Sequence, residues 1–296
     1  MLSLDELSQK YDFDYGYVND FVEELAINEE LLSKVSAIST NPCQILPNCK
    51  TVVVLAFKHD NFSKNSNIAA FAWGEDYHNK LKKIGEKLIP LFNDAIFLTD
   101  THILNERYFA KKSGIGHIGK NSMFISDKFG SFCHLAILLT SDKLSNNRKS
   151  IKHCGSCTKC IDACPTNAIG EQIDCRKCLS ERLQSRNNLD FQNIGNNVYG
   201  CDICQNVCPY NIFDKSPTLL YNNVSIENLL FLKKKEFDLF KDRTFYWIGY
   251  RSFIRNIHVA YVNNTQDYSK LSFLENSNSQ YLKDVAKVLK GDEFND

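Results

Sequence analysis

Residues 154–165 read CGSCTKCIDACP, and residues 201–209 read CDICQNVCP. The first run repeats the C-x2-C-x2-C-x3-C-P spacing of bacterial ferredoxins, in which the fourth cysteine binds a neighbouring cluster. The second run supplies three cysteines and a Cys-Pro ending, so it lacks one ligand. Together the two runs predict a module that folds around two 4Fe-4S clusters and transfers electrons through them.

The assignment that completes both clusters exchanges one cysteine between the runs. Cluster 1 takes four ligands: Cys154, Cys157, Cys160 and Cys208. Cluster 2 takes three ligands from the runs, which are Cys164, Cys201 and Cys204. Its fourth ligand comes from the segment between the runs, where Cys175 and Cys178 are both available.

Zinc is the alternative to iron–sulfur clusters, because paired C-x2-C motifs also build zinc sites. A zinc site requires neither a third cysteine at the same spacing nor a Cys-Pro ending in both runs. A disulfide scaffold is a further alternative, but it is typical of small secreted chains. Nine of the twelve cysteines lie between residues 154 and 208 in short, regular spacings. We therefore favour two 4Fe-4S clusters.

Composition sets limits on the rest of the chain. With 296 residues, 43% of them hydrophobic, the chain is long enough to form a substantial core. The formal net charge is zero, which does not support a globally basic nucleic-acid binder. The first residues show no signal-peptide pattern, and no apolar stretch approaches the roughly 20 residues of a membrane span. We expect a cytoplasmic, monomeric protein that is not bound to a membrane.

Hydrophobic periodicity divides the chain into three segments. Residues 1–145 mix apolar runs typical of strands, at 51–57, 95–99, 123–126 and 133–140, with helical spacing at 17–36 and 76–93. Residues 146–215 contain the cysteine runs, and residues 216–296 return to helical spacing. The predicted fold class is α+β, with an α/β core, a ferredoxin-like module and C-terminal helices.

Motifs outside the cysteine runs identify a family. They are WGEDYH at 73–78, Asp100-Thr101 followed by Glu106-Arg107, GIGHIGKN at 114–121, and GSF at 130–132. Their order, with the cysteine runs behind them, resembles the epoxyqueuosine reductases. These are cobalamin-dependent iron–sulfur enzymes that reduce epoxyqueuosine to queuosine at the wobble position of tRNA, the last step of queuosine synthesis. The resemblance extends from about residue 40 to residue 260.

The resemblance implies an architecture as well as an activity. Residues 1–145 would form a cobalamin-binding core like that of reductive dehalogenases, residues 146–215 the two-cluster module, and residues 216–296 helices that contribute to the tRNA surface. It favours Cys178 over Cys175 as the remaining ligand of cluster 2. The chain ends before the helical repeats that long members append, so we expect the short form.

The resemblance gives Asp100 the role of proton donor. An opening epoxide leaves an alkoxide that must be protonated, and a carboxylic acid does this near neutral pH only if its pKa is raised. Burial against the corrin would raise that pKa. Without the family pattern, an aspartate after an apolar strand is more simply a turn residue or a helix N-cap.

The family pattern also marks residues expected to contact cobalamin. Arg107 and Lys120 would meet its amide or phosphate groups, although each alone is more often a solvated charge. His78 could equally be an ordinary residue at a helix start. The full expected set is Asp76, His78, Asp100, Arg107, Lys120, Asn121, Gly130, Ser131 and Asp202.

The expected partners are the anticodon stem-loop of tRNA and an external low-potential electron donor. Residues 246–255 interleave Arg251 and Arg255 with aromatic residues, which suits phosphate contact and base stacking. An amphipathic helix with an aromatic core face explains the same pattern, and the sequence alone favours that alternative. Two other functions remain: a plain electron-transfer protein, and a cobalamin and iron–sulfur reductase of a small molecule. The large core with Asp100 disfavours the first, and the lack of an export signal disfavours the second.

Overall fold

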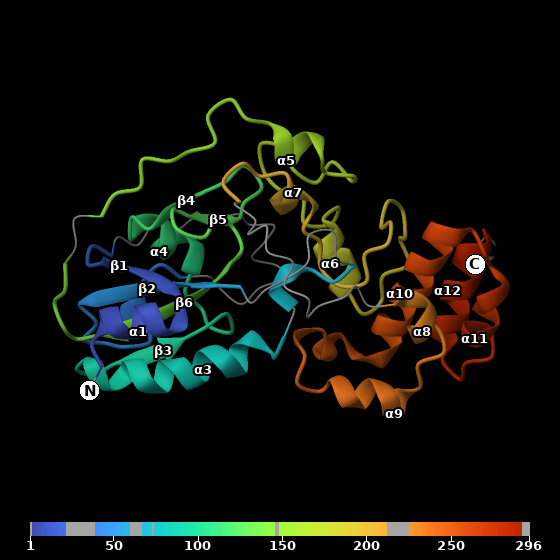
Figure 1. The fold of residues 1–296 in the computed structure, drawn as a ribbon, viewed down its shortest axis with the longest axis horizontal. Helices are drawn as coiled ribbons and strands as arrows, with labels where there is room; N and C mark the ends of the chain where they lie inside the picture. Colours follow the sequence, from blue (N-terminus) through green and yellow to red (C-terminus); the bar gives the residue numbers. More distant parts are fainter. Residues whose placement is uncertain are drawn as a thin grey trace. The chain divides into compact units, whose positions relative to one another are not determined.

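The structure is a computed structural model that describes residues 2–21, 39–59, 67–72, 74–145, 148–211 and 225–291. The chain forms two compact units, each assembled from several segments. The first unit comprises Met1–His59, Tyr77–Cys157 and Pro209–Phe213, and the second comprises Asp60–Asp76, Thr158–Cys208 and Asp214–Asp296. The cysteine-rich segment is therefore shared between the units. Figure 1 shows the elements of each unit along the chain.

A four-stranded antiparallel sheet forms the centre of the first unit. Its order is β1 (Phe13–Val18), β2 (Thr51–Lys58), β6 (Cys133–Thr140) and β3 (Ile96–Leu98). Strands predicted at 51–57, 95–99 and 133–140 are confirmed. The run at 123–126 forms β5 (Phe124–Ser126), which pairs with β4 (Gly116–Ile118) in a separate two-stranded sheet.

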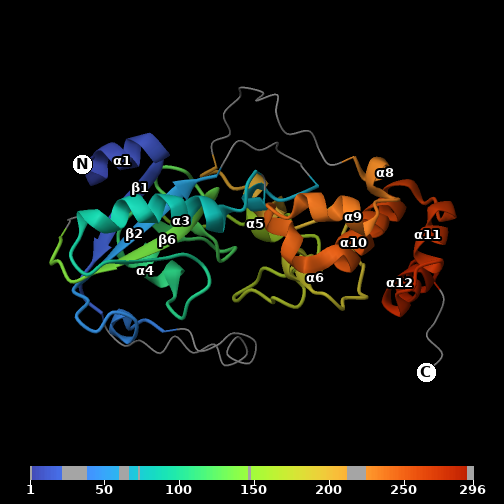
Figure 2. The ribbon, with the colours of Figure 1, turned by 90° about the horizontal axis from the view of Figure 1, so that it is seen from below.

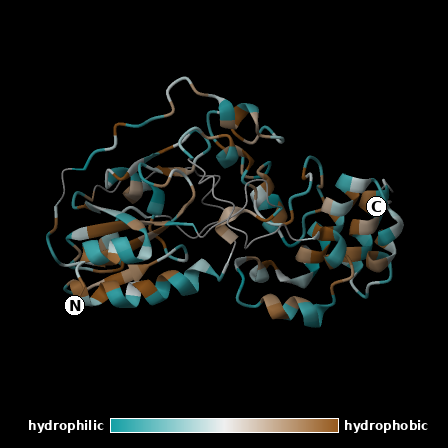
Figure 3. Ribbon diagram, in the orientation of Figure 1, coloured by the Kyte–Doolittle hydropathy of each residue, from teal (hydrophilic) through white to brown (hydrophobic). Residues whose placement is uncertain are grey.

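Helices cover both faces of the four-stranded sheet. Along β2, Val53, Leu55 and Phe57 face the apolar side of α1 (Leu4–Tyr11) and α3 (Tyr77–Leu88). The alternate residues Val52, Val54 and Ala56 pack with α4 (Glu106–Lys112), because successive side chains of a strand point to opposite faces. Figure 2 shows α3 and α4 on opposite sides of the sheet, and Figure 3 shows hydrophobic and hydrophilic residues alternating along α3.

The helical predictions for the N-terminal half have different outcomes. The helix expected over residues 76–93 is confirmed as α3, continued by a 3-10 turn at Ile89–Leu91 that contains Pro90. The helix expected over residues 17–36 is wrong for Tyr17 and Val18, which belong to β1, and residues 22–36 lie outside the described part. Both residues pair with β2, so strand pairing replaces helix formation there.

Short helices dominate the second unit. Three occur in the cysteine-rich segment: α5 (Lys159–Asp162), α6 (Leu179–Gln184) and α7 (Ile203–Asn206). The C-terminal helices are α8 (Ile226–Leu229), α9 (Lys234–Phe237), α10 (Gly249–Thr265), α11 (Ser272–Glu275) and α12 (Gln280–Lys290). The helical character predicted for this part is confirmed. In the described residues, no helix combines the length and the apolar character that a membrane span requires.

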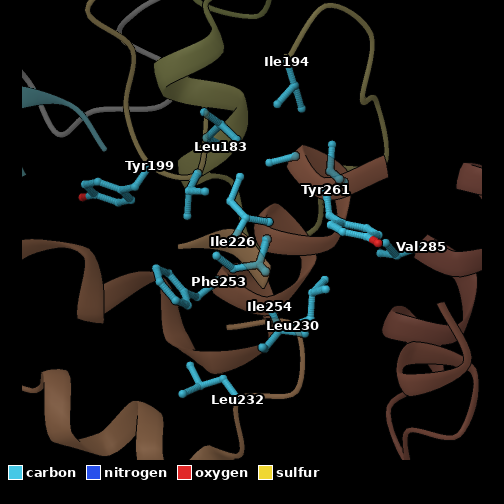
Figure 4. Close-up of a cluster of buried hydrophobic side chains, with 14 of the residues drawn as sticks. Leu183, Ile194, Tyr199, Ile226, Leu230, Leu232, Phe253, Ile254, Tyr261 and Val285 are labelled. Carbon is cyan, nitrogen blue, oxygen red and sulfur yellow. The ribbon is translucent and has the colours of Figure 1, made fainter. Parts of the chain in front are cut away.

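A single hydrophobic cluster organises the second unit around α10. Phe253, Ile254 and Tyr261 from α10 pack against Leu183 of α6 and Val285 of α12 (Figure 4). The stretch between the cysteine runs therefore contributes to a side-chain core that it shares with the C-terminal helices. That core anchors the backbone from which the predicted cluster ligands project.

Candidate active site and cluster module

Asp100 lies in a tight turn directly after β3. Its φ of 56° is in the left-handed region, which aspartate tolerates better than most residues. The turn is fixed by the backbone N–H of His102, which donates to the Asp100 carbonyl at 2.8 Å, and by the Asp100 N–H, which donates to Glu106 Oε1 at 3.0 Å. Asp100 is not a helix N-cap, because Asn105 caps α4.

Two neighbouring residues at the start of α3 hold the Asp100 carboxylate. Asp100 Oδ2 accepts hydrogen bonds from the Tyr77 hydroxyl at 2.8 Å and from His78 Nε2 at 3.1 Å. The bond from His78 lowers the pKa of Asp100, and it outweighs the opposing effect of burial. The Asp100 side chain is 57% exposed, so no apolar surface covers it in the described structure. The rise in the pKa of Asp100 was expected from burial against the corrin, so it stays a prediction.

The GIGHIGKN motif leaves two buried polar side chains unsatisfied. His117 on β4 is 8% exposed, and neither of its ring nitrogens has a hydrogen-bond partner among the described residues. Asn121 is 3% exposed; its Oδ1 accepts from the Met123 N–H at 3.3 Å, whereas its Nδ2 has no partner in that same set. Buried polar groups are almost always paired, so these nitrogens are available to a water molecule or to a polar group of a cofactor. Cobalamin carries amides and a phosphate, and these two residues fit it.

Gly130 and Ser131 form a closed network with Asn211. Asn211 Oδ1 accepts from the Ser131 N–H at 2.6 Å, and Asn211 Nδ2 donates to the Ser131 hydroxyl at 2.9 Å. Gly130 has a φ of +66°, and a Cβ there would lie 2.1 Å from Asn211 Oδ1. The sequence did not point to Asn211, which follows the second cysteine run by three residues. Its only signal was that position, immediately behind a predicted ligand loop.

The remaining members of the expected cobalamin set occupy varied surroundings. Lys120 is exposed, and its Nζ donates to the carbonyl of Cys157 at 2.9 Å, which brings its charge to the predicted cluster 1 loop. Arg107 is exposed on α4. The backbone N–H of Asp76 donates to the carbonyl of Asp242 at 2.8 Å. Their contacts with a cofactor stay predictions.

Asp202 ties the second cysteine run to residues 67–72 within the second unit. Its Oδ2 accepts from the Ala70 N–H at 2.6 Å, and its Oδ1 accepts from Gln205 Nε2 at 2.8 Å. Burial raises the pKa of Asp202 to about 6, although both hydrogen bonds oppose the rise. The Asp202 carboxylate thus fixes the backbone at Ala70, and Asp202 itself lies between two predicted cluster ligands, Cys201 and Cys204.

Three of the cysteines assigned to cluster 2 lie near one another. Burial raises the pKa of the Cys201 thiol to about 12, and the neighbouring Cys178 and Cys164 contribute to the rise. Burial opposes ionisation of Cys164 as well, but the hydrogen bonds around its sulfur outweigh it and lower the pKa, including one donated by the Ala168 N–H at 3.3 Å. Hydrogen bonds of this kind stabilise a thiolate, the form that binds iron. The choice of Cys178 over Cys175 as the fourth ligand stays a prediction.

The geometry of the cysteines does not by itself choose the metal. All twelve cysteines are free thiols. In the part of the chain that the structure describes, no three or more His, Cys, Asp or Glu side chains are grouped to hold a metal ion. Cys154 and Cys157 belong to the first unit, whereas Cys160 and Cys208 belong to the second, so the ligand set of cluster 1 stays a prediction.

The aromatic and basic stretch at 246–255 is mainly a core element. Arg255 is 1% exposed and donates to backbone carbonyls, so it is not available to phosphate. The alternative that the sequence favoured, a helix with a core face, is confirmed for this residue. Arg251 and Trp247 are exposed. Arg186, which the sequence did not single out, lies with its guanidinium 5.8 Å from the centre of the Trp247 ring and donates to the Trp247 carbonyl at 2.9 Å.

Comparisons with known proteins agree with the motifs. Residues 153–211 match the family described as "4Fe-4S double cluster binding domain", and residues 40–100 match "Epoxyqueuosine reductase QueG, DUF1730". The first match makes residues 153–211 an iron–sulfur module and favours clusters over zinc. The second covers Asp100 at its last position.

Relatives named epoxyqueuosine reductase match over different lengths. The relative from Lactococcus garvieae (strain Lg2) is 30% identical over an alignment 306 residues long, gaps included. This alignment covers 92% of this chain and 84% of the relative. The relative from Bacillus cereus is 35% identical over 193 residues, which cover 58% of this chain, and the chain spans about half, 51%, of that relative. A solved epoxyqueuosine reductase with an epoxyqueuosine-modified tRNA-Tyr stem loop superimposes with a TM-score of 0.81 at 26% identity, over 97% of this chain and 89% of that one. The chain belongs to the epoxyqueuosine reductase family.

Proposed function

We propose that the chain reduces epoxyqueuosine to queuosine at the wobble position of tRNA. Electrons from an external low-potential donor would pass through two 4Fe-4S clusters to cobalamin, and Asp100 would supply a proton. The single observation that carries the proposal beyond family membership is the Asp100 carboxylate, which follows β3 in a left-handed turn and is held by hydrogen bonds from Tyr77 and His78. Such a substrate places the enzyme in the cytoplasm.

The reaction balances with two electrons and two protons. Both bonds from the epoxide oxygen to carbon break, a carbon–carbon double bond forms, and the oxygen leaves as water. Cobalamin, when bound, supplies the low-potential cobalt chemistry that a side chain cannot perform. The chain must orient the substrate and deliver a proton to the departing oxygen.

The surroundings of Asp100 suit a proton donor that becomes active on closure of the site. In the described structure, bonds from His78 and Tyr77 favour the carboxylate. The exposed side chain would lose water when cofactor and substrate cover it, and desolvation raises the pKa of a carboxyl group. His78 is 34% exposed, and its Nε2 forms a hydrogen bond with Asp100 Oδ2, the oxygen that also accepts from Tyr77. His78 therefore provides a route by which Asp100 is reprotonated.

We propose that His117 and Asn121 hold polar groups of cobalamin. Gly130 and Ser131, which Asn211 fixes in place, would contribute to the same site. The unsatisfied nitrogens of His117 and Asn121 support this role. The tRNA partner would be bound mainly through its phosphate backbone, with an affinity that falls as the salt concentration rises.

The test is anaerobic reconstitution of the full chain with iron, sulfide and cobalamin, followed by incubation with a strong reductant and tRNA that carries epoxyqueuosine. Mass spectrometry of the nucleosides should show the loss of one oxygen atom. Asp100→Asn should keep both cofactors and lose turnover. Asp94→Asn is the matched control, because Asp94 also has a positive φ, 42°, is exposed, and lies just before β3.

Intact epoxyqueuosine, with clusters and cobalamin both bound to the wild-type chain, would overturn the proposal. Equal turnover by Asp100→Asn and by the wild type would leave the activity standing but remove Asp100 from its role.

A further inference from the structure

Tyr77 and His78 belong to a column of four rings in the first unit, of which three are stacked and the fourth, His59, is tilted by 43°. The Tyr77 ring lies between His78, with ring centres 4.0 Å apart, and His134, with ring centres 4.2 Å apart and planes 12° from parallel. His134 in turn lies 4.1 Å from His59. Asp100 is bound at the exposed end of this column, and His59 at the other end is 6% exposed.

The sheet explains why these rings meet. His134 on β6 is the cross-strand partner of Phe57 on β2, so the two side chains share one face. His59 follows Phe57 by two residues, and its N–H donates to the Phe132 carbonyl at 3.0 Å, which continues the pairing of the strands. That face is the one covered by α3, and α3 begins at Tyr77. The fold therefore places the Tyr77 ring directly on His134.

The two buried histidine rings, His59 and His134, are neutral at physiological pH. Burial lowers the pKa of His59 to about 3. Burial also lowers the pKa of His134 well below its ordinary value, and electrostatic interactions with neighbouring basic groups, Lys80 among them, lower it further. A neutral imidazole offers a flat aromatic face without adding a charge next to Asp100. His134 thus acts through the shape and the stacking of its ring.

We propose that His134 is a positioning residue: its ring holds the Tyr77 ring, so that the Tyr77 hydroxyl and His78 stay on the Asp100 carboxylate. This inference rests on the proposed function, in which Asp100 delivers the proton. A tyrosine hydroxyl needs a fixed ring to keep a 2.8 Å bond to one carboxylate oxygen. The stacked His134 ring restricts the rotation that would break that bond.

Other charged groups face Asp100, and they remain in place when His134 is changed. Glu106 Oε1 accepts both from the Asp100 N–H and from His102 Nε2 at 3.1 Å. His102 lowers the pKa of Asp100 through its charge. A change at position 134 therefore isolates the contribution of the Tyr77 ring.

The experiment compares His134→Leu with His134→Phe in the full chain with both clusters. The phenylalanine variant keeps a flat ring, whereas the leucine variant removes it. Single-turnover reduction of epoxyqueuosine by His134→Leu should fall about ten-fold to a hundred-fold, the size of effect that a small misplacement of a reacting group produces. His134→Phe should stay within about two-fold of the wild type, because stacking is retained.

A double-mutant cycle shows whether His134 acts through Tyr77. Tyr77→Phe keeps the ring and removes the hydroxyl, so adding His134→Leu to Tyr77→Phe should cause little further loss. Phe13→Leu is the control, since Phe13 is a fully buried ring on the same face whose ring contacts Phe57 at 4.9 Å between ring centres. It should leave turnover unchanged.

A second readout does not depend on turnover. The carboxyl carbon of Asp100, labelled with 13C and assigned with Asp100→Asn, is titrated by NMR in the chain with oxidised clusters. Loss of the Tyr77 bond should raise the titration midpoint of Asp100 in His134→Leu and not in His134→Phe. If the wild type does not reduce epoxyqueuosine, the proposed function fails while this titration still tests the inference.

Three results would overturn the inference. The first is an unchanged midpoint in His134→Leu. The second is an equal effect of the leucine and phenylalanine variants, which would show that the imidazole itself is required. The third is the same loss from His134→Leu with and without the Tyr77 hydroxyl.

Discussion

Arg255 offers the sharpest test of how the second unit is held together. Its side chain is 1% exposed and forms no ion pair among the described residues. Instead Nη1 donates to the Ser185 carbonyl at 2.7 Å, Nη2 to the Leu183 carbonyl at 2.8 Å, and Nε to Asn256 Oδ1 at 2.8 Å. Ser185 and Leu183 stand at the C-terminal end of α6, where the helix dipole favours a cation.

The cost of removing the guanidinium follows from which acceptors it leaves without a donor. In Arg255→Met, the Leu183 carbonyl keeps a bond from Asn256 Nδ2 at 3.0 Å. The Tyr281 hydroxyl also loses a bond from Arg255 Nη1 at 2.7 Å but keeps its own bond to the Asn188 carbonyl. The Ser185 carbonyl and Asn256 Oδ1 lose the donor that Arg255 provides, and each buried acceptor left unpaired costs about 1–3 kcal/mol. The methionine keeps the apolar stem, and the guanidinium no longer has to be desolvated. We expect a net loss of about 3 kcal/mol.

Hydrogen exchange measured peptide by peptide is the suitable assay, because a chain of two compact units is not expected to unfold in a single two-state step. Exchange in α6 and α10 should become roughly a hundred-fold faster, since about 1.4 kcal/mol corresponds to a factor of ten. Peptides from the sheet of the first unit should be unaffected. Arg251→Met, at an exposed position of the same helix, should change the opening free energy derived from exchange by less than about 0.5 kcal/mol. An effect of Arg255→Met no larger than that of Arg251→Met would refute the reasoning.

Further predictions concern the clusters and the pH dependence of stability. Cys208→Ser should damage cluster 1 rather than cluster 2 in EPR spectra, and damage confined to cluster 2 would contradict the exchanged ligand assignment. Lys120→Met removes a positive charge bound to the Cys157 carbonyl, so it should lower the midpoint potential of cluster 1 in an EPR-monitored redox titration; an unchanged or higher potential would contradict it. His59 has a pKa of about 3 in the folded chain against an ordinary value of 6.5. Between these pH values only the unfolded chain binds this proton, so the stability present above pH 6.5 falls by about 1.4 kcal/mol per pH unit on acidification. His59→Gln should reduce that slope in urea unfolding, and an equal slope would show that His59 is not responsible.

Several parts of the site were readable in the sequence because they depend on short spacings. The ligand loop Cys154–Cys160 folds locally, and the N–H of Cys157 donates to the carbonyl of Cys154 at 3.1 Å. The strand of residues 51–57 was predictable because an unbroken apolar run is stable only when both faces are covered. Asp100 was found only through the order of motifs, since a single aspartate after a strand carries no pattern of its own.

Other features arise from residues far apart in the chain. Asn211 bonds Ser131 across 80 residues, and Arg148 binds Asp14 across 134 residues. Neither the burial of Arg255 nor the effect of His78 on the pKa of Asp100 could be predicted from the sequence. In each case the sequence showed the charge, but the partners that surround it come from other elements.

The sequence by itself determined the iron–sulfur module, the mixed α+β class and the family, because each rests on spacings or on motifs in order. Only the tertiary structure decided which groups meet: that β6 carries His134 beneath Tyr77, and that Tyr77 and His78 converge on one oxygen of Asp100. The physical reason is range. Local spacing fixes where a side chain lies on its own helix or strand, whereas the pKa of a carboxyl group depends on every charge, donor and apolar surface that folding brings near it.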